Sequence, residues 1–288
     1  MSDTKTFLIT GANSGFGFAI AKAAVAAGHR VVGTARSAEA AAKVEALDPE
    51  RAFARVLDVT DFAAIPGVVG EVEHTLGPVH VLVNNAGYGQ IGMFEEQEPE
   101  APERQFATNV FGPMHVTRAV LPSMRERRRG LIFNISAMAG VRGGAGFSLF
   151  SASKFALEGF TESLVQEIQP FGLHATLVCP GYFRTDFLSE SSIRFGERQV
   201  DAYEALAQYQ REFVADRNGQ QLGDPVKLAR ILVHLSRDEN PPLRLPVGSD
   251  AVEALAQKIR RLQDELEEWR ELSVTTDYDV HCPALSAS

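Results

Sequence analysis

The sequence predicts a single domain of the α/β class, built on a doubly wound parallel sheet with helices on both faces. Three observations support this class. Short apolar runs alternate with longer helical stretches, which is the pattern of repeated βα units. Several of these runs are apolar almost throughout, as strands buried on both faces of a parallel sheet are. The length of 288 residues provides one large core and does not require two domains.

The expected elements follow one another in the order that this class requires. Strands are predicted at Thr6–Thr10, Arg30–Thr34, Phe53–Asp58, Val79–Val83, Leu131–Ile135, Leu173–Val178 and Leu243–Pro246. Helices are predicted between them at Phe18–Ala27, Ala38–Ala46, Phe62–Leu76, Pro102–Arg127 and Ser151–Gln169. Gly28 and Gly172 stand just past helix ends, where a left-handed residue often closes a helix. We therefore assign residues 1–250 to one domain.

Two segments lie outside this alternation. Phe187–Leu222 interrupts the last crossover, and a structureless loop of that length is unusual, so we expect a helical lid; a surface excursion without a role is the alternative. Farther on, one apolar stripe recurs at three- and four-residue steps and predicts a C-terminal helix: Val252, Leu255, Ile259, Leu262, Leu266 and Trp269. We expect residues 251–288, this helix and its tail, to pack on the same domain. Dimerisation through the helix, or closure of one side of a pocket, are the alternatives.

Composition excludes several classes of protein. A net charge of −9 argues against a nucleic-acid binder, which normally carries a basic face. Two cysteines, Cys179 and Cys282, cannot form a disulfide framework, so a reducing cytoplasm is the expected location. The first strand begins by Phe7, which leaves no room for a signal peptide, and no apolar run reaches transmembrane length. The seven histidines are scattered, so no metal site is expected.

A glycine-rich loop joins the first predicted strand to the first helix. It spans Thr10–Gly17 with the spacing T-G-x-x-x-G-x-G. Glycines at such a junction let the backbone amides approach a pyrophosphate, and the helix N-terminus favours its negative charge. The placement between strand and helix makes a dinucleotide site the stronger interpretation than a simple tight turn. The expected contacts are Gly11, Asn13, Ser14, Gly15, Phe16 and Gly17.

The end of the second strand distinguishes between two cofactors. Enzymes that use NAD usually place a carboxylate there to hold the ribose hydroxyls. This chain instead has Gly33–Arg36, with a guanidinium suited to bidentate hydrogen bonds with a 2′-phosphate. We therefore expect NADP(H). Asp58, followed by Val59, ends the third strand, and its carboxylate is equally suited to accept from the adenine amino group or to cap the next helix.

Further motifs follow the later strands in a fixed order. Asn84–Gly87 follows the fourth strand, Asn109 lies within a long helix, Ser136 follows the fifth strand, and Lys154 lies near a helix start. Pro180 and Gly181 follow the sixth strand, with Thr185 close behind. Together with the glycine loop, this ordered set resembles the short-chain dehydrogenase/reductase family in its classical, NADP-preferring form. The resemblance spans Thr6 to Gly248.

The resemblance implies a Rossmann-type fold and a homo-oligomeric oxidoreductase, a dimer or tetramer, that interconverts a ketone and a secondary alcohol. It implies that Ser136 stabilises negative charge on the substrate oxygen. It implies that Lys154 holds the nicotinamide ribose and lowers the pKa of a neighbouring phenol, and that Asn109 fixes a water molecule that relays protons to Lys154. Further cofactor contacts would come from Asn85, Ala86, Gly87, Pro180, Gly181, Phe183 and Thr185.

Phe150 departs from the family pattern, which places the proton-donating tyrosine here. A phenyl ring has no donor, acceptor or titratable proton. Loss of general acid catalysis typically costs on the order of 10²–10⁴ in rate, whereas cofactor binding should be nearly intact. Either the residue is an engineered Tyr-to-Phe change or a natural protein has abandoned the donor and serves as a silent NADP-binding sensor or interaction module. We favour the first, because Ser136, Lys154 and Asn109 remain. Tyr88 or Tyr182 could substitute as donor.

Aromatic and sulfur-containing side chains are expected around the reacting carbon. They are Met93, Phe94, Phe147, Tyr182, Phe183, Phe187 and Phe195. Such a lining suits a lipid-like, aromatic or polyketide-type ketone or alcohol. The alternative is that several of these residues belong to the core.

Overall fold

Seven parallel strands form one central sheet in a computed structural model that describes residues 4–189 and 192–278. The strand order is β3-β2-β1-β4-β6-β7-β9, and every neighbouring pair is parallel. The bounds are β1 (Thr6–Ile9), β2 (Arg30–Ala35), β3 (Ala52–Val56), β4 (Val81–Asn84), β6 (Gly130–Ile135), β7 (Leu173–Pro180) and β9 (Arg244–Val247). The predicted doubly wound sheet is therefore confirmed. The strand order reverses between β1 and β4, and ligands of such sheets bind at the carboxyl ends of the strands there.

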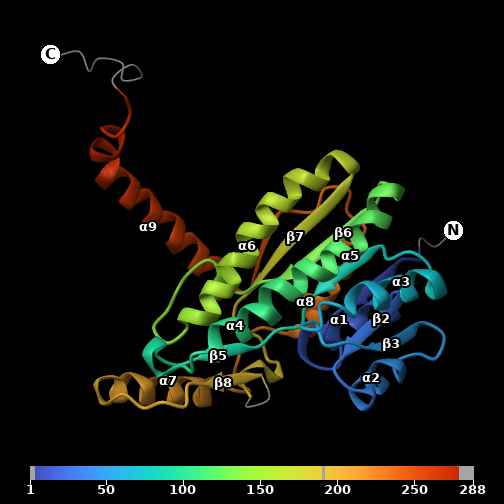
Figure 1. Ribbon diagram of the computed structural model, residues 1–288, viewed down its shortest axis with the longest axis horizontal. Coiled ribbons are helices and arrows are strands. Elements are labelled where there is room, and N and C mark those ends of the chain that lie inside the picture. The colour runs from blue at the N-terminus through green and yellow to red at the C-terminus, as the bar shows by residue number, and fades with distance from the viewer. Residues whose placement is uncertain (1–3, 190–191, 279–288) are drawn as a thin grey trace.

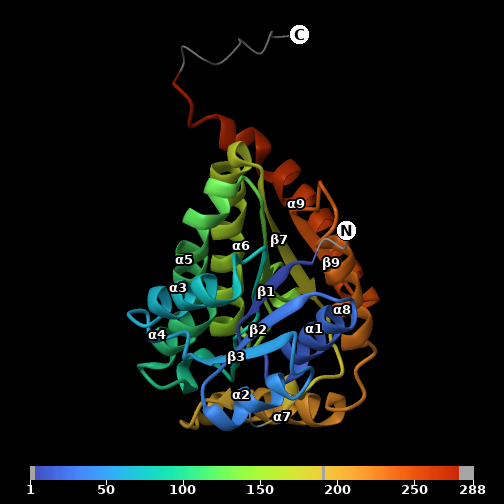
Figure 2. The same ribbon diagram turned by 90° about the vertical axis from the view of Figure 1, so that its right-hand side faces the viewer.

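Helices cover both faces of this sheet, as Figure 2 shows. One face carries α1 (Gly15–Ala26), α2 (Ala38–Glu45) and α8 (Pro225–Leu235), whose apolar sides share one core cluster with the strands. The other face carries α3 (Ile65–Leu76), α5 (Gly112–Arg127) and α6 (Ser148–Ile168), which form a second cluster. The two clusters hold the strands between them, so the carboxyl ends of β1, β4, β6 and β7 have fixed relative positions.

The predicted helix Pro102–Arg127 is helical throughout in the structure but widens near its middle. It consists of α4 (Ala101–Phe106), a π-helical stretch η2 (Ala107–Phe111), and α5. Pro113 has no backbone N–H, so the carbonyl of Asn109, four residues earlier, lacks its ordinary helical donor. Single π-turns of this kind occur mostly at functional sites. The predicted helix is therefore present, and its π-helical turn is a local feature that periodicity alone does not reveal.

The predicted lid, Phe187–Leu222, is helical only in part. It begins within η5 (Asp186–Leu188), continues through β8 (Ile193–Phe195) and η6 (Asp201–Tyr203), and then forms α7 (Glu204–Arg217). Residues 190–191 lie outside the described residues. β8 pairs with β5 (Gly89–Ile91) in a separate two-stranded sheet, so the lid is held against the loop after β4. In Figure 1, α7, β8 and β5 lie together at the lower left of the molecule.

The C-terminal helix α9 (Ser249–Val274) projects from the body of the protein (Figure 1). Ala251 and Ala254, in its first turns, are buried. Beyond them, α9 runs past the domain, because 26 residues extend about 39 Å at 1.5 Å per residue. The first turns of α9 therefore contact the domain, and residues 279–288 lie outside the described part; that residues 251–288 belong to the same domain stays a prediction. Among the described residues, no helix has both the length and the apolar character needed to span a bilayer.

Candidate active site

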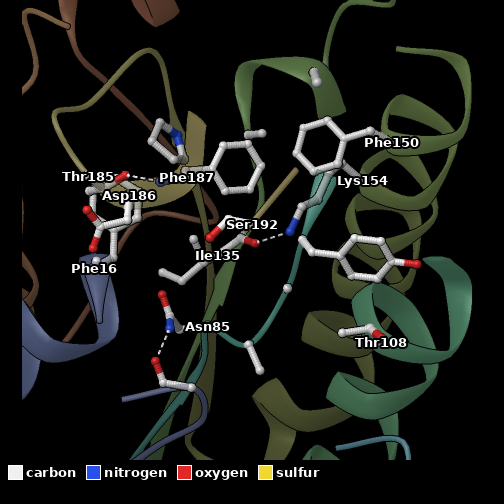
Figure 3. A pocket seen from close by; sticks show the side chains of 18 of the residues that line it. Phe16, Asn85, Thr108, Ile135, Phe150, Lys154, Thr185, Asp186, Phe187 and Ser192 are labelled. Carbon is white, nitrogen blue, oxygen red and sulfur yellow. Dashed lines mark hydrogen bonds between the residues drawn. The ribbon is translucent and has the colours of Figure 1, made fainter. Parts of the chain in front are cut away.

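A cavity of about 1010 Å³ lies at the carboxyl ends of the strands and collects most of the predicted residues. Those predicted to bind the cofactor or take part in chemistry and found in its lining are Gly11, Asn13, Ser14, Gly15, Phe16, Arg36, Asp58, Val59, Asn85, Ala86, Gly87, Ser136, Phe150, Lys154, Pro180, Gly181, Phe183 and Thr185. Phe147, Tyr182 and Phe187 line it from the predicted substrate side. Segments far apart in the sequence therefore meet in one space (Figure 3).

Five predicted residues lie outside this lining. Gly17 and Asn109 support it from behind, as described below. Met93 is buried beside the two-stranded sheet, and Phe94 is largely exposed. Phe195 packs with the buried cluster around Ile91 rather than facing the cavity. The expected substrate contacts of Met93, Phe94 and Phe195 therefore find no support in the geometry.

The glycine loop is fixed to the strand at the switch point. Gly11 has a positive φ of 63°, and a Cβ there would lie 3.0 Å from the Cα of Ala86. A Cβ on Gly17 would collide with the carbonyl oxygen of Gly11. The Asn85 amide donates to the carbonyls of Thr10 and Gly11, at 2.9 and 3.0 Å. Glycines at 11 and 17 are thus required for a close approach of backbone to backbone, which keeps the start of α1 open to the cavity.

The N-terminus of α1 provides backbone donors to the cavity. Ser14 is its N-cap residue and lines the cavity, and within the described chain its side chain makes no capping hydrogen bond. The first N–H groups of a helix have no partners within the helix and carry partial positive charge. This end of the cavity is therefore suited to an anionic group such as a pyrophosphate.

The end of β2 presents Arg36 to the same cavity. Ala35 ends the strand, Arg36 is exposed, and the Ser37 hydroxyl caps α2 by accepting from the Ala40 amide at 3.2 Å. Asp58, on the neighbouring strand end, accepts through Oδ1 from both the amide and the hydroxyl of Thr60, at 2.9 and 2.7 Å. These bonds close a local turn and do not cap the next helix, because α3 begins at Ile65 with Ala64 as its N-cap residue. The capping alternative for Asp58 is therefore wrong, and the adenine contact stays a prediction.

Phe150 occupies the first turn of α6, with its ring in the cavity and only 5% of the residue exposed. Its ring centroid lies 5.5 Å from that of Phe187 and 5.8 Å from the Lys154 amine. Figure 3 shows these three side chains side by side. Lys154, one turn later, donates from Nζ to the carbonyl oxygen of Ile135 at 2.8 Å. Burial lowers the pKa of Lys154 to about 8, although nearby Cys179 and Glu158 oppose the shift. A phenol at this position would therefore lie close to a lysine whose pKa is lower than usual.

Ser136 belongs to a buried polar chain behind the cavity. Its hydroxyl donates to Oε1 of Glu158 at 2.8 Å, and Oε2 of Glu158 accepts from the Arg244 guanidinium at 2.8 Å. Arg244 also pairs with Glu162. Burial and the adjacent Glu158 raise the pKa of the Cys179 thiol well above its usual range. A hydroxyl has one proton, so in this arrangement Ser136 offers lone pairs rather than a donor to the cavity.

Asn109 lies in the π-helical stretch and connects two parts of the site. Its side-chain amide donates to the Tyr88 carbonyl at 3.0 Å and to the Ser153 hydroxyl at 3.1 Å, and its oxygen accepts from the Tyr88 amide at 3.2 Å. Asn109 therefore fixes the loop after β4 to the helix that carries Phe150 and Lys154. Its expected role in holding a water molecule stays a prediction.

Comparison with known sequences identifies the family. The profile of the family described as short chain dehydrogenase matches residues 5–194, which is more than half of the chain. The chain belongs to the short-chain dehydrogenase family. A short-chain dehydrogenase from Streptomyces avermitilis has a crystal structure that superimposes with a TM-score of 0.89 at 44% identity, covering 96% of this chain and 100% of that one. The 3-ketodihydrosphingosine reductase of Bacteroides thetaiotaomicron is 38% identical over 244 residues, which cover 84% of this chain and 87% of that protein.

Solved relatives of this short-chain dehydrogenase hold different nicotinamide cofactors. One from Burkholderia phymatum, in complex with NAD, has a TM-score of 0.75 at 26% identity and covers 93% of this chain and 95% of its own. A Tyr-to-Phe variant of ElxO, with NADPH bound, has a TM-score of 0.69 at 25% identity and covers 83% of this chain and 93% of its own. The family therefore fixes a nicotinamide cofactor, whereas the choice between NAD and NADP depends on the residues of this chain.

Sequence reasoning missed several residues that shape the site of this short-chain dehydrogenase. Phe150, Lys154 and Glu158 are four residues apart and so share one buried face of α6. This spacing could have identified Glu158 as a residue near the site. Asp250 at the start of α9 accepts from the Tyr182 amide at 2.7 Å and fills the space beside Gly181. Gln221 is buried in the cavity lining, and among the described residues both atoms of its amide have no hydrogen-bond partner. Asp250 and Gln221 come from distant segments, and no local pattern marks them.

The burial of Lys154 should be visible as a pH dependence of stability. Its folded pKa of about 8 lies below the ordinary 10.5, so between these values the unfolded chain binds more protons than the folded one. Stability should therefore rise with pH through this window, by roughly 3 kcal/mol in total for this group. Urea unfolding of the wild type and of Lys154→Met across pH 7–10.5 should show the rise in their difference. A difference independent of pH would contradict the shifted pKa.

Proposed function

We propose that this short-chain dehydrogenase is an NADP(H)-dependent oxidoreductase that interconverts a ketone and a secondary alcohol on an apolar substrate, with turnover strongly reduced by Phe150. The observation that carries the proposal is the meeting of three groups in one cavity: the glycine loop, Arg36, and the set Ser136, Phe150 and Lys154. The first two suit a phosphorylated dinucleotide. The third is a carbonyl-reducing set that lacks one oxygen atom.

The residues at the cofactor end fit NADP(H). The open N-terminus of α1 and the close approach at Gly11 would hold the pyrophosphate, and the Arg36 guanidinium would hold the 2′-phosphate through charge-assisted hydrogen bonds. Lys154 would donate to the nicotinamide ribose hydroxyls in place of the Ile135 carbonyl. The structure of a Tyr-to-Phe variant of ElxO with NADPH bound shows that a relative with such a change holds this cofactor. When bound, the cofactor supplies or accepts the hydride.

At the chemical end, the side chains of this chain bind and polarise the substrate oxygen. Ser136 would turn its hydroxyl from Glu158 toward that oxygen and stabilise developing negative charge. Phe150 holds the substrate by contact but delivers no proton, so the proton must come from solvent or from a weaker donor. Burial raises the pKa values of Tyr88 and Tyr182, which makes either of them a weaker acid than an ordinary tyrosine.

The substrate is an apolar ketone or alcohol. Phe147, Tyr182 and Phe187 form the aromatic side of the cavity, together with Leu188 and Phe213. The large volume leaves space for a bulky group beyond the reacting carbon. The reductase of 3-ketodihydrosphingosine among the relatives supports this substrate class.

The second candidate is a silent NADP-binding sensor or interaction protein in which Phe150 is native. Two hydrogen bonds favour this candidate. Ser136 donates to Glu158 and Lys154 donates to the Ile135 carbonyl, so neither donates to the cavity. The codon at position 150 in the source organism separates the two: a tyrosine codon supports a disabled reductase, and a phenylalanine codon supports the sensor.

Calorimetric titration tests the cofactor proposal directly. NADPH should bind about 10- to 100-fold more tightly than NADH, since hydrogen bonds to charged groups contribute about 1.5–3 kcal/mol. A preference for NADH, or equal affinities, would rule out the role given to Arg36. A panel of apolar ketones, measured with NADPH oxidation as the readout, then tests the substrate class.

A further inference from the structure

Six large apolar residues of α9 keep a heptad spacing between positions 252 and 269. Their spacing alternates three and four residues, so they occupy the a and d positions of a coiled coil: Val252, Leu255, Ile259, Leu262, Leu266 and Trp269. Five of these residues are 48–57% exposed, and Leu255 is partly buried near the body. A repeat of 3.5 residues keeps such a stripe facing one partner helix over its whole length, whereas a helix on a globular core follows a period of 3.6.

The remaining surface of α9 is charged and forms its own ion pairs. Arg260 pairs with Glu253 at 3.1 Å, and Arg261 pairs with Glu265 at 2.7 Å. Glu253, Arg260 and Arg261 lie on the outer faces of the helix and Glu265 flanks the stripe, so the heptad residues form the apolar side of α9. An exposed stripe of this length on a projecting helix marks an interaction surface.

We propose that the stripe binds α9 of a second copy of this chain, in an antiparallel two-stranded coiled coil. Each a residue then lies beside a d residue of the partner. Val252 would contact the partner's Trp269, Leu255 the partner's Leu266, and Ile259 the partner's Leu262. The smallest side chain thus meets the largest, whereas a parallel pair would oppose two tryptophans at one layer and two valines at another.

The charges that flank the stripe complement each other in the same arrangement. Lys258 and Glu265 occupy successive g positions, and in the antiparallel register Lys258 of each copy faces Glu265 of the other. In a parallel pair, Lys258 would instead face Gln263 and Glu265 would face Arg270, so the charges suit both orientations and the sizes of the facing side chains favour the antiparallel one. The two bodies lie at opposite ends of the antiparallel pair, which avoids crowding around the buried first turns.

Light scattering coupled to size-exclusion chromatography tests the interface with the full chain. Leu262→Glu places a charge in the middle of the stripe and should halve the measured mass relative to the wild type. Gln257→Glu introduces the same side chain on an exposed outer position and should leave the mass unchanged. A monomeric wild type, or a wild-type mass retained by Leu262→Glu, would overturn the proposal. Thermal unfolding checks that both variants fold.

A charge exchange tests the orientation and the identity of the partner. Lys258→Glu and Glu265→Lys should each weaken the association at least tenfold, because like charges meet twice across the antiparallel pair. The double variant should recover the wild-type association, since each contact is then reversed but opposite in sign. Recovery requires that the partner be another copy of the same helix in antiparallel register. A double variant as weak as the single ones would overturn that arrangement, and NADPH titration, which involves none of these residues, should be unchanged throughout.

Discussion

Replacing Phe150 with tyrosine should raise the turnover of an apolar ketone by about two to four orders of magnitude, the range of general acid catalysis. The substitution adds one oxygen to a ring that already lies in the cavity, 5.8 Å from the amine of Lys154. Because Lys154 carries a positive charge close by, it should lower the pKa of the new phenol and make it a better acid. Steady-state rates of NADPH oxidation over a ketone panel measure the effect.

Phe187→Tyr provides the matched control, since it adds the same oxygen to the neighbouring ring in the same cavity. It should leave turnover low. NADPH affinity should hardly change in Phe150→Tyr, because the proposed contacts of the cofactor are made by the glycine loop, Arg36 and Lys154. The restored enzyme should lose rate as the pH leaves the window set by the Tyr–Lys pair, and the phenylalanine form should lack this dependence. A Phe150→Tyr protein that stays inert on every ketone and alcohol would favour the silent binding protein.

Replacing Arg36 with alanine should weaken NADPH binding by about 10- to 100-fold and change NADH binding by less than about threefold. The reason is that only NADPH carries the 2′-phosphate that the guanidinium would bind, while the pyrophosphate contacts of the two cofactors are the same. Calorimetric titration of both cofactors against both proteins gives the four constants.

Arg51→Ala serves as the control, because Arg51 is an exposed arginine outside the cavity lining. It removes the same formal charge and should change neither affinity by more than the general effect of net charge. If Arg36→Ala weakened the binding of NADH as much as that of NADPH, Arg36 would be stabilising the fold at the end of β2 rather than binding the 2′-phosphate.

Local patterns predicted the sheet and most of the cavity, since strands are continuous apolar runs and the loops after them carry the polar motifs. Their limits appear at particular residues. The π-helical stretch around Asn109 depends on one missing N–H at Pro113, which a helical period does not register. The strand β8 forms only by pairing with β5, a contact about a hundred residues away in sequence. Likewise, Ser136 donates to Glu158 of α6, and Arg244 of β9 in turn donates to Glu158, so this inward hydrogen bond could be found only in the tertiary structure.

The contact between Asp250 and the Gly181–Tyr182 segment sets the boundary of the smallest fragment worth expressing. A chain that ends at β9 would lack Asp250, whose carboxylate accepts a hydrogen bond from the Tyr182 amide. One wall of the cavity would then lose its support. A chain cut after the second turn of α9 would keep Asp250, Ala251 and Ala254 and discard only the projecting part. Affinity tags and fluorescent fusions therefore belong beyond that turn, and crystallisation trials of shortened chains should begin there.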